Sequence, residues 1–260
     1  MTMVPPTILK ISAIDVFASL DPKSIALLFD VDGTLVEIGP SPFEVDIPDD
    51  LLGSLRRLSE LTGGALALVS GRPIVDLDHL FSPLTLPVIG GHGAEMRLRG
   101  DAERPTPRIL SEEFRRRLAE AANLDSGIVV EDKGYSLALH YRLAPQCAER
   151  LRKHVAACRA AFASEPTELL LGKAMFEVKL PGINKGDAVR ALMTHEPFTG
   201  RTPVFVGDDI TDEAVFKVLP ALGGKSFSVT RHFAGLSGIF ESPKHVRSAL
   251  RQLAGLAQPS

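Results

Sequence analysis

Short apolar runs alternate with amphipathic stretches at both ends of the chain. Residues 25–31 (IALLFDV) and 65–71 (ALALVSG) have the composition of buried strands, and each is followed by a helical pattern, at 48–61 and at 73–81. The same alternation returns later, in the segments KGDAVRALM (185–193), TPVFVGDD (202–209), TDEAVFKVL (211–219) and KHVRSALRQLAGL (244–256). Because strands that alternate with helices form parallel sheets, we predict an α/β core built from βαβ units.

The middle of the chain has a different pattern. Helical periodicity occurs at 112–123 and 144–162, and period-two alternation typical of strands occurs at 128–142, 168–172 and 175–180. Alternating strands with helices on one side are typical of an antiparallel sheet in a separate layer. We therefore predict a smaller α/β domain inserted into the core, with the core formed by residues 1–100 and 181–260 and the inserted domain by residues 101–180.

The predicted strands of the inserted domain have one polar and one apolar face. Because side chains alternate along a strand, the polar face carries Glu131, Lys133, His140, Arg142, Glu177 and Lys179. The opposite face carries Leu137, Leu139, Tyr141, Phe176, Val178 and Leu180. One interpretation of the polar face is an ordinary solvated surface. The other is a platform that binds a ligand with many hydroxyl groups, and the alternation pattern alone leaves both interpretations open.

Composition narrows the class of partner. At 260 residues and 45% hydrophobic content, the chain can bury a full core. Its formal charge of −3 and its lack of a long Lys/Arg run give no electrostatic footprint for nucleic acid. We expect no membrane span, because no segment approaches ~20 apolar residues, and we expect no export signal in the N-terminal stretch. We expect a small-molecule ligand and a monomeric protein.

The two cysteines are informative about the compartment. Cys147 and Cys158 lie eleven residues apart in a predicted helix. A rise of ~1.5 Å per residue separates them by ~16 Å, which is too far for a disulfide. Reduced thiols favour a cytoplasmic location.

Three predicted strands of the core end in reactive groups: FDVDGT (29–34), LVSGR (68–72) and FVGDD (205–209). In parallel α/β sheets, ligands bind beyond the carboxyl ends of the strands. The site would then gather four carboxylates, those of Asp30, Asp32, Asp208 and Asp209. Carboxylates so close together need a compensating cation, and hard oxygen ligands predict Mg²⁺.

Other interpretations of these motifs are structural. The Asp-Gly pair after Asp30 is also typical of a tight turn, and Asp212 and Glu213 are also typical of a helix start. A calcium loop of the EF-hand type is excluded, because, with Asp30 as position one, glycine stands at position four rather than six and position twelve is Ser41.

The spacing predicts a phosphoryl-transfer site. An aspartate at a strand tip, Asp30, can attack phosphorus, and Asp32 can protonate the leaving oxygen and then activate water. Ser70 offers a hydroxyl to the phosphate, and Lys185, at the start of a predicted helix, offers a positive charge. We therefore expect Asp30, Asp32, Ser70 and Lys185 to be the catalytic residues.

In this order, DVDGT, Ser70, Lys185 and GDD resemble the four motifs of the haloacid dehalogenase superfamily. More narrowly, the chain from about residue 25 to 225 resembles the trehalose-6-phosphate phosphatase family, in the segments DVDGTLVEI, LVSGR, GGHGAE, KGYSLALHYR, FEVKLPGINKG and GRTPVFVGDDITDE. The resemblance implies a Rossmann-like core with a mobile α/β cap, trehalose 6-phosphate as the substrate, and sugar recognition by the cap.

The resemblance also implies ligands. Mg²⁺ would be bound by the Asp30 side chain, the Asp32 main-chain carbonyl and Asp208, with Asp209 and Asp212 supporting it through its waters. The substrate would be bound by the cap residues named above and by Arg72 and His92. His92 and Glu95 follow a predicted strand, and they are expected either to bind the sugar or to fix the loop.

Several alternatives remain at this point. A phosphatase for another sugar phosphate, such as sucrose phosphate, or a phosphosugar mutase would use a similar cap. A phospho-acceptor signalling module needs neither Asp32 nor an inserted domain. An inactive domain that binds sugar phosphate would not need an intact set of Asp30, Asp32, Lys185 and Asp208.

Overall fold

The computed structural model describes residues 12–39, 45–98, 109–172 and 174–256. The chain forms two compact units, the first made of Met1–Glu37, Ile47–Leu68 and Arg190–Ser260 and the second of Ile38–Asp46 and Val69–Val189. The domain boundaries expected near residues 100 and 181 remain a prediction. Most of the N-terminal stretch in which we expected no export signal, and residues 101–108 of the expected inserted domain, lie outside the described residues.

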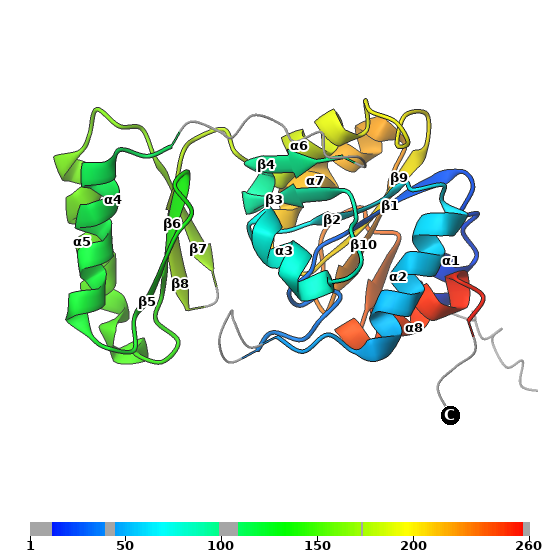
Figure 1. Ribbon diagram of the computed structural model, residues 1–260, viewed down its shortest axis with the longest axis horizontal. Coiled ribbons are helices and arrows are strands. Elements are labelled where there is room, and N and C mark those ends of the chain that lie inside the picture. The colour runs from blue at the N-terminus through cyan, green and yellow to red at the C-terminus, as the bar shows by residue number, and fades with distance from the viewer. Residues whose placement is uncertain (1–11, 40–44, 99–108, 173, 257–260) are drawn as a thin grey trace, which may run out of the picture. The chain divides into compact units, whose positions relative to one another are not determined.

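A twisted parallel sheet forms the centre of the first unit (Figure 1). Of the seven strands of this sheet, five lie in the order β11 (Gly238–Phe240), β10 (Lys225–Val229), β9 (Thr202–Gly207), β1 (Ile25–Phe29) and β2 (Leu66–Val69) and are parallel. Strand β1 is buried along its whole length, and its last residue, Phe29, is paired with Val206 of β9. This register brings the carboxyl ends of β1 and β9 side by side. The parallel α/β core predicted from the sequence is confirmed.

Helices bury their apolar stripes against this sheet. They are α1 (Ala13–Ala18), α2 (Asp49–Leu61), α7 (Glu213–Val218) and α8 (Pro243–Leu253). In α2 the buried residues Leu51, Leu55 and Leu58 recur at the spacing of one helical face. Rings also fill the core, where Phe17 of α1 packs edge to face on Phe227 at 5.4 Å between centroids. The hydrophobic periodicity therefore sets which helix face meets the sheet.

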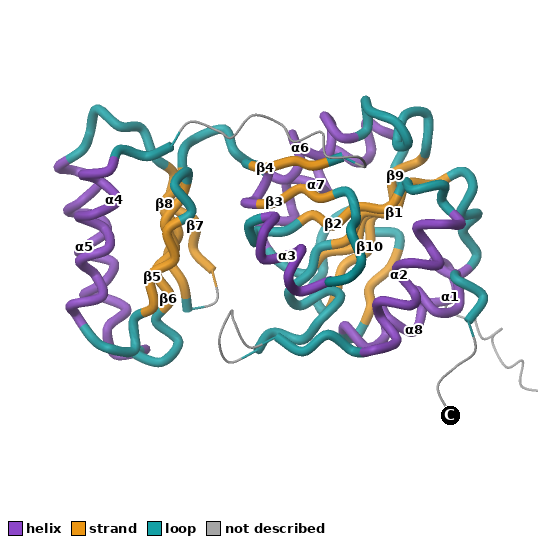
Figure 2. The backbone as a smooth tube through the Cα atoms, viewed as in Figure 1, coloured by secondary structure: helices purple, strands orange, loops and turns teal. Residues whose placement is uncertain are grey.

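The second unit contains a separate antiparallel sheet of four strands (Figures 1 and 2). Their order is β5 (Val129–Asp132), β6 (Ser136–His140), β8 (Met175–Lys179) and β7 (Glu168–Gly172). The helices α4 (Glu112–Ala119) and α5 (Ala148–Ala161) cover one face of it. The unit also contains α3 (Ile74–Phe81), the antiparallel pair β3 (Val88–Gly90) and β4 (Glu95–Arg97), and the start of α6 (Lys185–Leu192).

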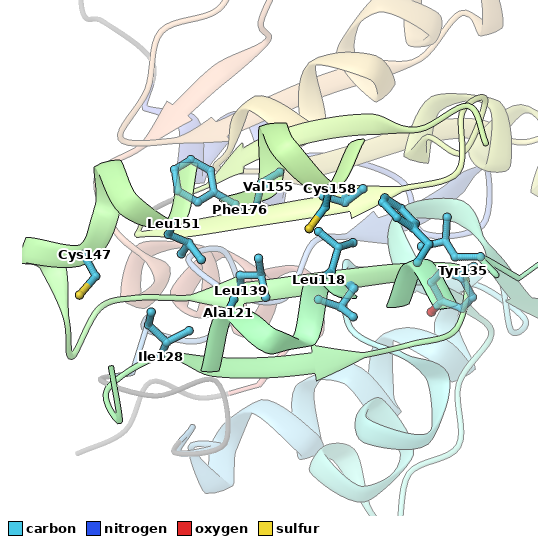
Figure 3. Close-up of a cluster of buried hydrophobic side chains, with 14 of the residues drawn as sticks. Leu118, Ala121, Ile128, Tyr135, Leu139, Cys147, Leu151, Val155, Cys158 and Phe176 are labelled. Carbon is cyan, nitrogen blue, oxygen red and sulfur yellow. The ribbon is translucent and has the colours of Figure 1, made fainter. Parts of the chain in front are cut away.

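The apolar face of the antiparallel sheet is buried under the helices, as the alternation predicts. Figure 3 shows Leu139 and Phe176 pointing toward Leu151 and Val155 of α5. Leu137, Val178 and Leu180 belong to the same cluster, and Tyr141 packs against it. Cys147 and Cys158 are buried free thiols. Among the described residues, no helix is both long enough and apolar enough to cross a membrane.

Candidate active site

Three buried carboxylates meet at the carboxyl ends of β1 and β9. Asp30 directly follows β1, and its N–H donates to the Val206 carbonyl at 2.9 Å, which continues the strand pairing. Carboxylate oxygens of Asp30, Asp208 and Asp212 all lie within 4.8 Å of one another. Three buried carboxylates at this spacing repel each other, and a divalent cation with oxygen ligands would compensate their charge. The donor set therefore fits Mg²⁺.

Asp32 lies on the tight turn formed by residues 31–36, directly after β1 and Asp30. The Gly33 N–H donates to the Val36 carbonyl at 2.8 Å, and the Leu35 N–H donates to the Val31 carbonyl at 2.9 Å. Gly33 has a φ of +85°, and a Cβ there would lie 2.6 Å from Cγ of Asp208. Only glycine combines this conformation with so close an approach to a carboxylate. The glycine of DVDGT thus lets the turn pack directly on the acidic cluster.

The acidic cluster contains Asp212 rather than Asp209. Oδ2 of Asp212 accepts the N–H groups of Asp208 at 2.9 Å and Asp209 at 3.0 Å. Asp209 caps the following 3₁₀ turn, Ile210–Asp212, and its carboxylate lies 3.2 Å from Arg231. Sequence reasoning grouped Asp209 with Asp208 and gave Asp212 only a supporting role. The available signal was the four-residue spacing from Asp208 to Asp212, which is one helical turn.

Ser70 and Lys185 lie in the second unit, and both are buried. The Ser70 N–H donates to the Ile89 carbonyl at 2.8 Å, and its Oγ accepts the Arg72 N–H at 3.2 Å. The Arg72 carbonyl in turn accepts the Gly91 N–H at 2.9 Å. Lys185 is the first residue of α6 and is only 3% exposed. Their backbones are thus fixed by secondary structure.

Glu177 is the centre of a buried polar network on the antiparallel sheet. Its Oε1 accepts the Ser136 hydroxyl at 2.7 Å, and its Oε2 lies 2.9 Å from His92 Nε2. Lys133 Nζ lies 3.7 Å from Glu177 and 3.5 Å from Glu131. Glu177 is 1% exposed. At these residues the polar face is therefore not an ordinary solvated surface.

The carboxylates of this face are held in their charged form. Burial raises the pKa of Glu131, but the hydrogen bond with His140 at 3.2 Å and the charge of Lys133 outweigh burial, so the pKa lies below its ordinary value. Burial also raises the pKa of Glu177, but the charges of His92 and Lys133 outweigh burial, so this pKa too lies below its ordinary value. Anionic carboxylates are strong acceptors for hydroxyl groups.

The other predicted residues of this face have different surroundings. Lys179 is buried, and its Nζ donates to Glu168 of β7 at 2.6 Å and to the Ile183 carbonyl. Arg142 is exposed and donates to the Gly39 carbonyl. The structure therefore brings His92, Glu131, Lys133, His140 and Glu177 into one set of contacts and places Lys179 and Arg142 outside that set.

An open pocket of about 370 Å³ adjoins the network within the second unit. Its lining residues are Pro73, Val75, Asp76, Glu95, Glu131, Asp132 and Lys133. Both oxygens of Glu95 are engaged, one by the Tyr135 hydroxyl at 2.7 Å and one by the Ile74 N–H at 2.7 Å. Of the two roles expected for Glu95, these contacts support fixing the loop. Tyr135 and Asp76 were not singled out from the sequence.

Comparison with known proteins adds independent evidence. The family model for trehalose-phosphatase matches residues 28–236. The trehalose-6-phosphate phosphatase of Escherichia coli (strain K12) is 38% identical over 239 residues, which are 87% of this chain and 88% of that protein.

Solved structures agree on the fold. The C-terminal domain of C. albicans trehalose-6-phosphate phosphatase superposes with a TM-score of 0.77 at 23% identity, over 94% of this chain and 96% of that one. A Bacteroides thetaiotaomicron phosphatase of the haloalkanoate (HAD) enzyme superfamily gives a TM-score of 0.59 at 15% identity, over 89% and 96% of the two chains. The superfamily fold predicted from the four motifs is confirmed.

Proposed function

The chain belongs to the trehalose-phosphatase family, and we propose that it is a phosphoric monoester hydrolase that converts trehalose 6-phosphate to trehalose and phosphate. The observation that carries the proposal is the buried cluster of Asp30, Asp208 and Asp212 at the carboxyl ends of two adjacent parallel strands. A cluster of this kind has little structural value without a cation, because it concentrates repulsion in the core of the first unit.

Asp30 is the nucleophile in this proposal. One of its carboxylate oxygens forms a bond to phosphorus while the bond from phosphorus to the sugar oxygen breaks. Asp32 gives its proton to the departing sugar oxygen. Asp32 then takes a proton from a water molecule, which attacks phosphorus and releases phosphate and the Asp30 carboxylate. Both aspartates therefore return to their starting states after each turnover.

The residues present fit a magnesium ion. The Asp30 and Asp208 carboxylates and the Asp32 main-chain carbonyl would hold it, and Asp212 would complete the buried acidic set. When bound, Mg²⁺ supplies positive charge that lowers the repulsion between the phosphate oxygens and Asp30. Asp209 is proposed to act on the ion only indirectly, because its carboxylate caps the 3₁₀ turn and contacts Arg231.

Ser70 and Lys185 are proposed to bind the transferring phosphoryl group. The hydroxyl of Ser70 donates to a phosphate oxygen, and Lys185 neutralises charge. Arg72, two residues after Ser70, is proposed to contact the substrate.

The polar face of the antiparallel sheet is proposed to select the sugar. Charged Glu131 and Glu177 accept hydrogen bonds from hydroxyl groups, while Lys133 and His140 donate to them. His92, which contacts Glu177, is included in this set. Arg142 and Lys179 are proposed to bind at its margin, since each has its own partner in the structure.

The test is phosphate release from trehalose 6-phosphate in the presence of Mg²⁺, with and without EDTA. Sucrose 6-phosphate, glucose 6-phosphate and mannose 6-phosphate serve as comparison substrates. We expect rapid, EDTA-sensitive release from the trehalose ester alone. Faster release from another ester would refute the sugar assignment, and no release from any ester would favour a binding protein without catalysis. We propose that the enzyme acts as a monomer in the cytoplasm.

A further inference from the structure

Arg247 of α8 forms hydrogen bonds to the segment that follows the DVDGT turn. Its Nη1 donates to the Leu35 carbonyl at 2.9 Å, and its two terminal nitrogens bind both carboxylate oxygens of Glu37, each at 3.0 Å. The guanidinium therefore contacts both the backbone and a side chain within three residues. Its planar fork suits such bidentate contact, which a lysine cannot reproduce. We call Arg247 and Glu37 the clamp.

Arg247 projects from a helix that is packed into the core of the first unit. Helix α8 buries Val246, Ala249, Leu250 and Leu253 in the first unit, and Ser242 caps its first turn. Arg247 is 13% exposed on its side chain, whereas Glu37 is 60% exposed. An ion pair with one partner this exposed contributes little to stability. Overall stability therefore does not account for so specific a geometry.

The position of the clamp along the chain points to catalysis. Residues 31–36 form the turn that carries Asp32, and the bridge between Asp32 and Val36 closes it. Glu37 is the last residue of the first segment of the first unit, and at Ile38 the chain passes into the second unit. Along the chain, Ile38 is connected to Asp32 through Leu35 and Glu37, the two residues that Arg247 binds.

We propose that Arg247, held by Glu37 and the Leu35 carbonyl, is a positioning residue that keeps Asp32 in place as the proton donor to the leaving group. This inference rests on the proposed function, in which Asp32 is the acid. Arg247 itself touches neither phosphate nor metal in this account. Its effect is on the precision with which the 31–36 turn presents Asp32.

The test is the dependence of kcat/KM on leaving-group basicity across a series of aryl phosphates. A well-placed acid makes the rate insensitive to the leaving group, and a misplaced acid slows mainly the basic leaving groups. The variant is Arg247→Met, which keeps the apolar stem of the side chain. The matched control is Arg251→Met, one turn later on α8, where the arginine is 14% exposed and pairs with Asp50 of α2 at 3.3 Å.

We expect Arg247→Met to lower kcat/KM about tenfold for the most basic leaving group and less than about twofold for the least basic, since general acid catalysis contributes ~10²–10⁴ in total. Arg251→Met should leave the series parallel to the wild type. Arg247→Lys and Glu37→Gln, which disturb the fold less, should give smaller changes in the same direction. An equal loss for every leaving group, or equal effects of Arg247→Met and Arg251→Met, would overturn the proposal. The aryl esters carry no sugar, so an error in the proposed sugar substrate leaves this comparison unchanged.

Discussion

Replacing Gly33 by alanine tests whether the acidic cluster is a metal site. The added Cβ would lie 2.6 Å from Cγ and 2.9 Å from Oδ1 of Asp208, inside any normal contact distance. A non-glycine residue at positive φ also costs about 1–2 kcal/mol. The strain is relieved if the Asp208 carboxylate turns away from Asp30 and Asp212. We therefore expect Gly33→Ala to fold but to bind Mg²⁺ at least about tenfold more weakly, because one of the cluster's oxygen ligands is displaced.

The assay is thermal unfolding with and without Mg²⁺. At a concentration of 100 times the wild-type Kd, an ion that binds only the folded state stabilises it by about 2.7 kcal/mol, and a tenfold weaker site reduces this to about 1.4 kcal/mol. The control is Gly53→Ala. Gly53 is an exposed residue of α2 with no atom within 4 Å of its added Cβ, so this change should stabilise the protein by about 0.5–1 kcal/mol.

The Mg²⁺-dependent stabilisation of Gly53→Ala should equal that of the wild type. An equal gain in Gly33→Ala, with unchanged turnover, would refute the reasoning, because the carboxylate of Asp208 would then be dispensable.

Three further predictions concern the second unit. The pKa of Glu177 is held below 4.5, so its charge stabilises the folded state fully above pH 4.5 and progressively less as the pH falls below that value. The stability lost in Glu177→Gln should therefore be constant from about pH 8 to 5 and should shrink as the pH is lowered further below 4.5; a loss that stays constant at every pH would contradict this. Burial and the hydrogen bond to Glu95 raise the pKa of Tyr135, so an ultraviolet titration of Tyr141→Phe should show phenolate only on unfolding, and ionisation in the folded protein would contradict it. Arg142→Ala should raise KM for trehalose 6-phosphate much more than for p-nitrophenyl phosphate, whereas equal losses would exclude sugar recognition.

The long apolar runs made the core predictable from the sequence. Strands β1 and β2 are uninterrupted apolar segments, β9 is buried from its second residue to its last, and this burial leaves little choice of structure. Strands β10 and β11 were missed because KSFSV alternates with serine and GIF has only three residues. Helix α1, with six residues, is too short to show a periodic pattern.

In the acidic cluster, only the residues that directly follow core strands could be predicted from the sequence. Asp30 and Asp208 follow directly from the ends of β1 and β9. The place of Asp212 depends on its side chain turning back to two backbone N–H groups, which spacing alone does not specify. The alternation rule put Lys179 on the same face as Glu177, but the register with Glu168 of β7 gave it a separate partner. Long-range pairs such as Glu37 with Arg247 leave no local signal in the sequence.

The most direct test of the account is acid quenching of the enzyme during its first turnover of trehalose 6-phosphate labelled in the phosphate. We predict that label becomes attached to the wild-type protein and is absent from Asp30→Asn. Phosphate release by Asp30→Asn at the wild-type rate, or labelling of that variant equal to the wild type, would contradict the assignment of Asp30 as the nucleophile.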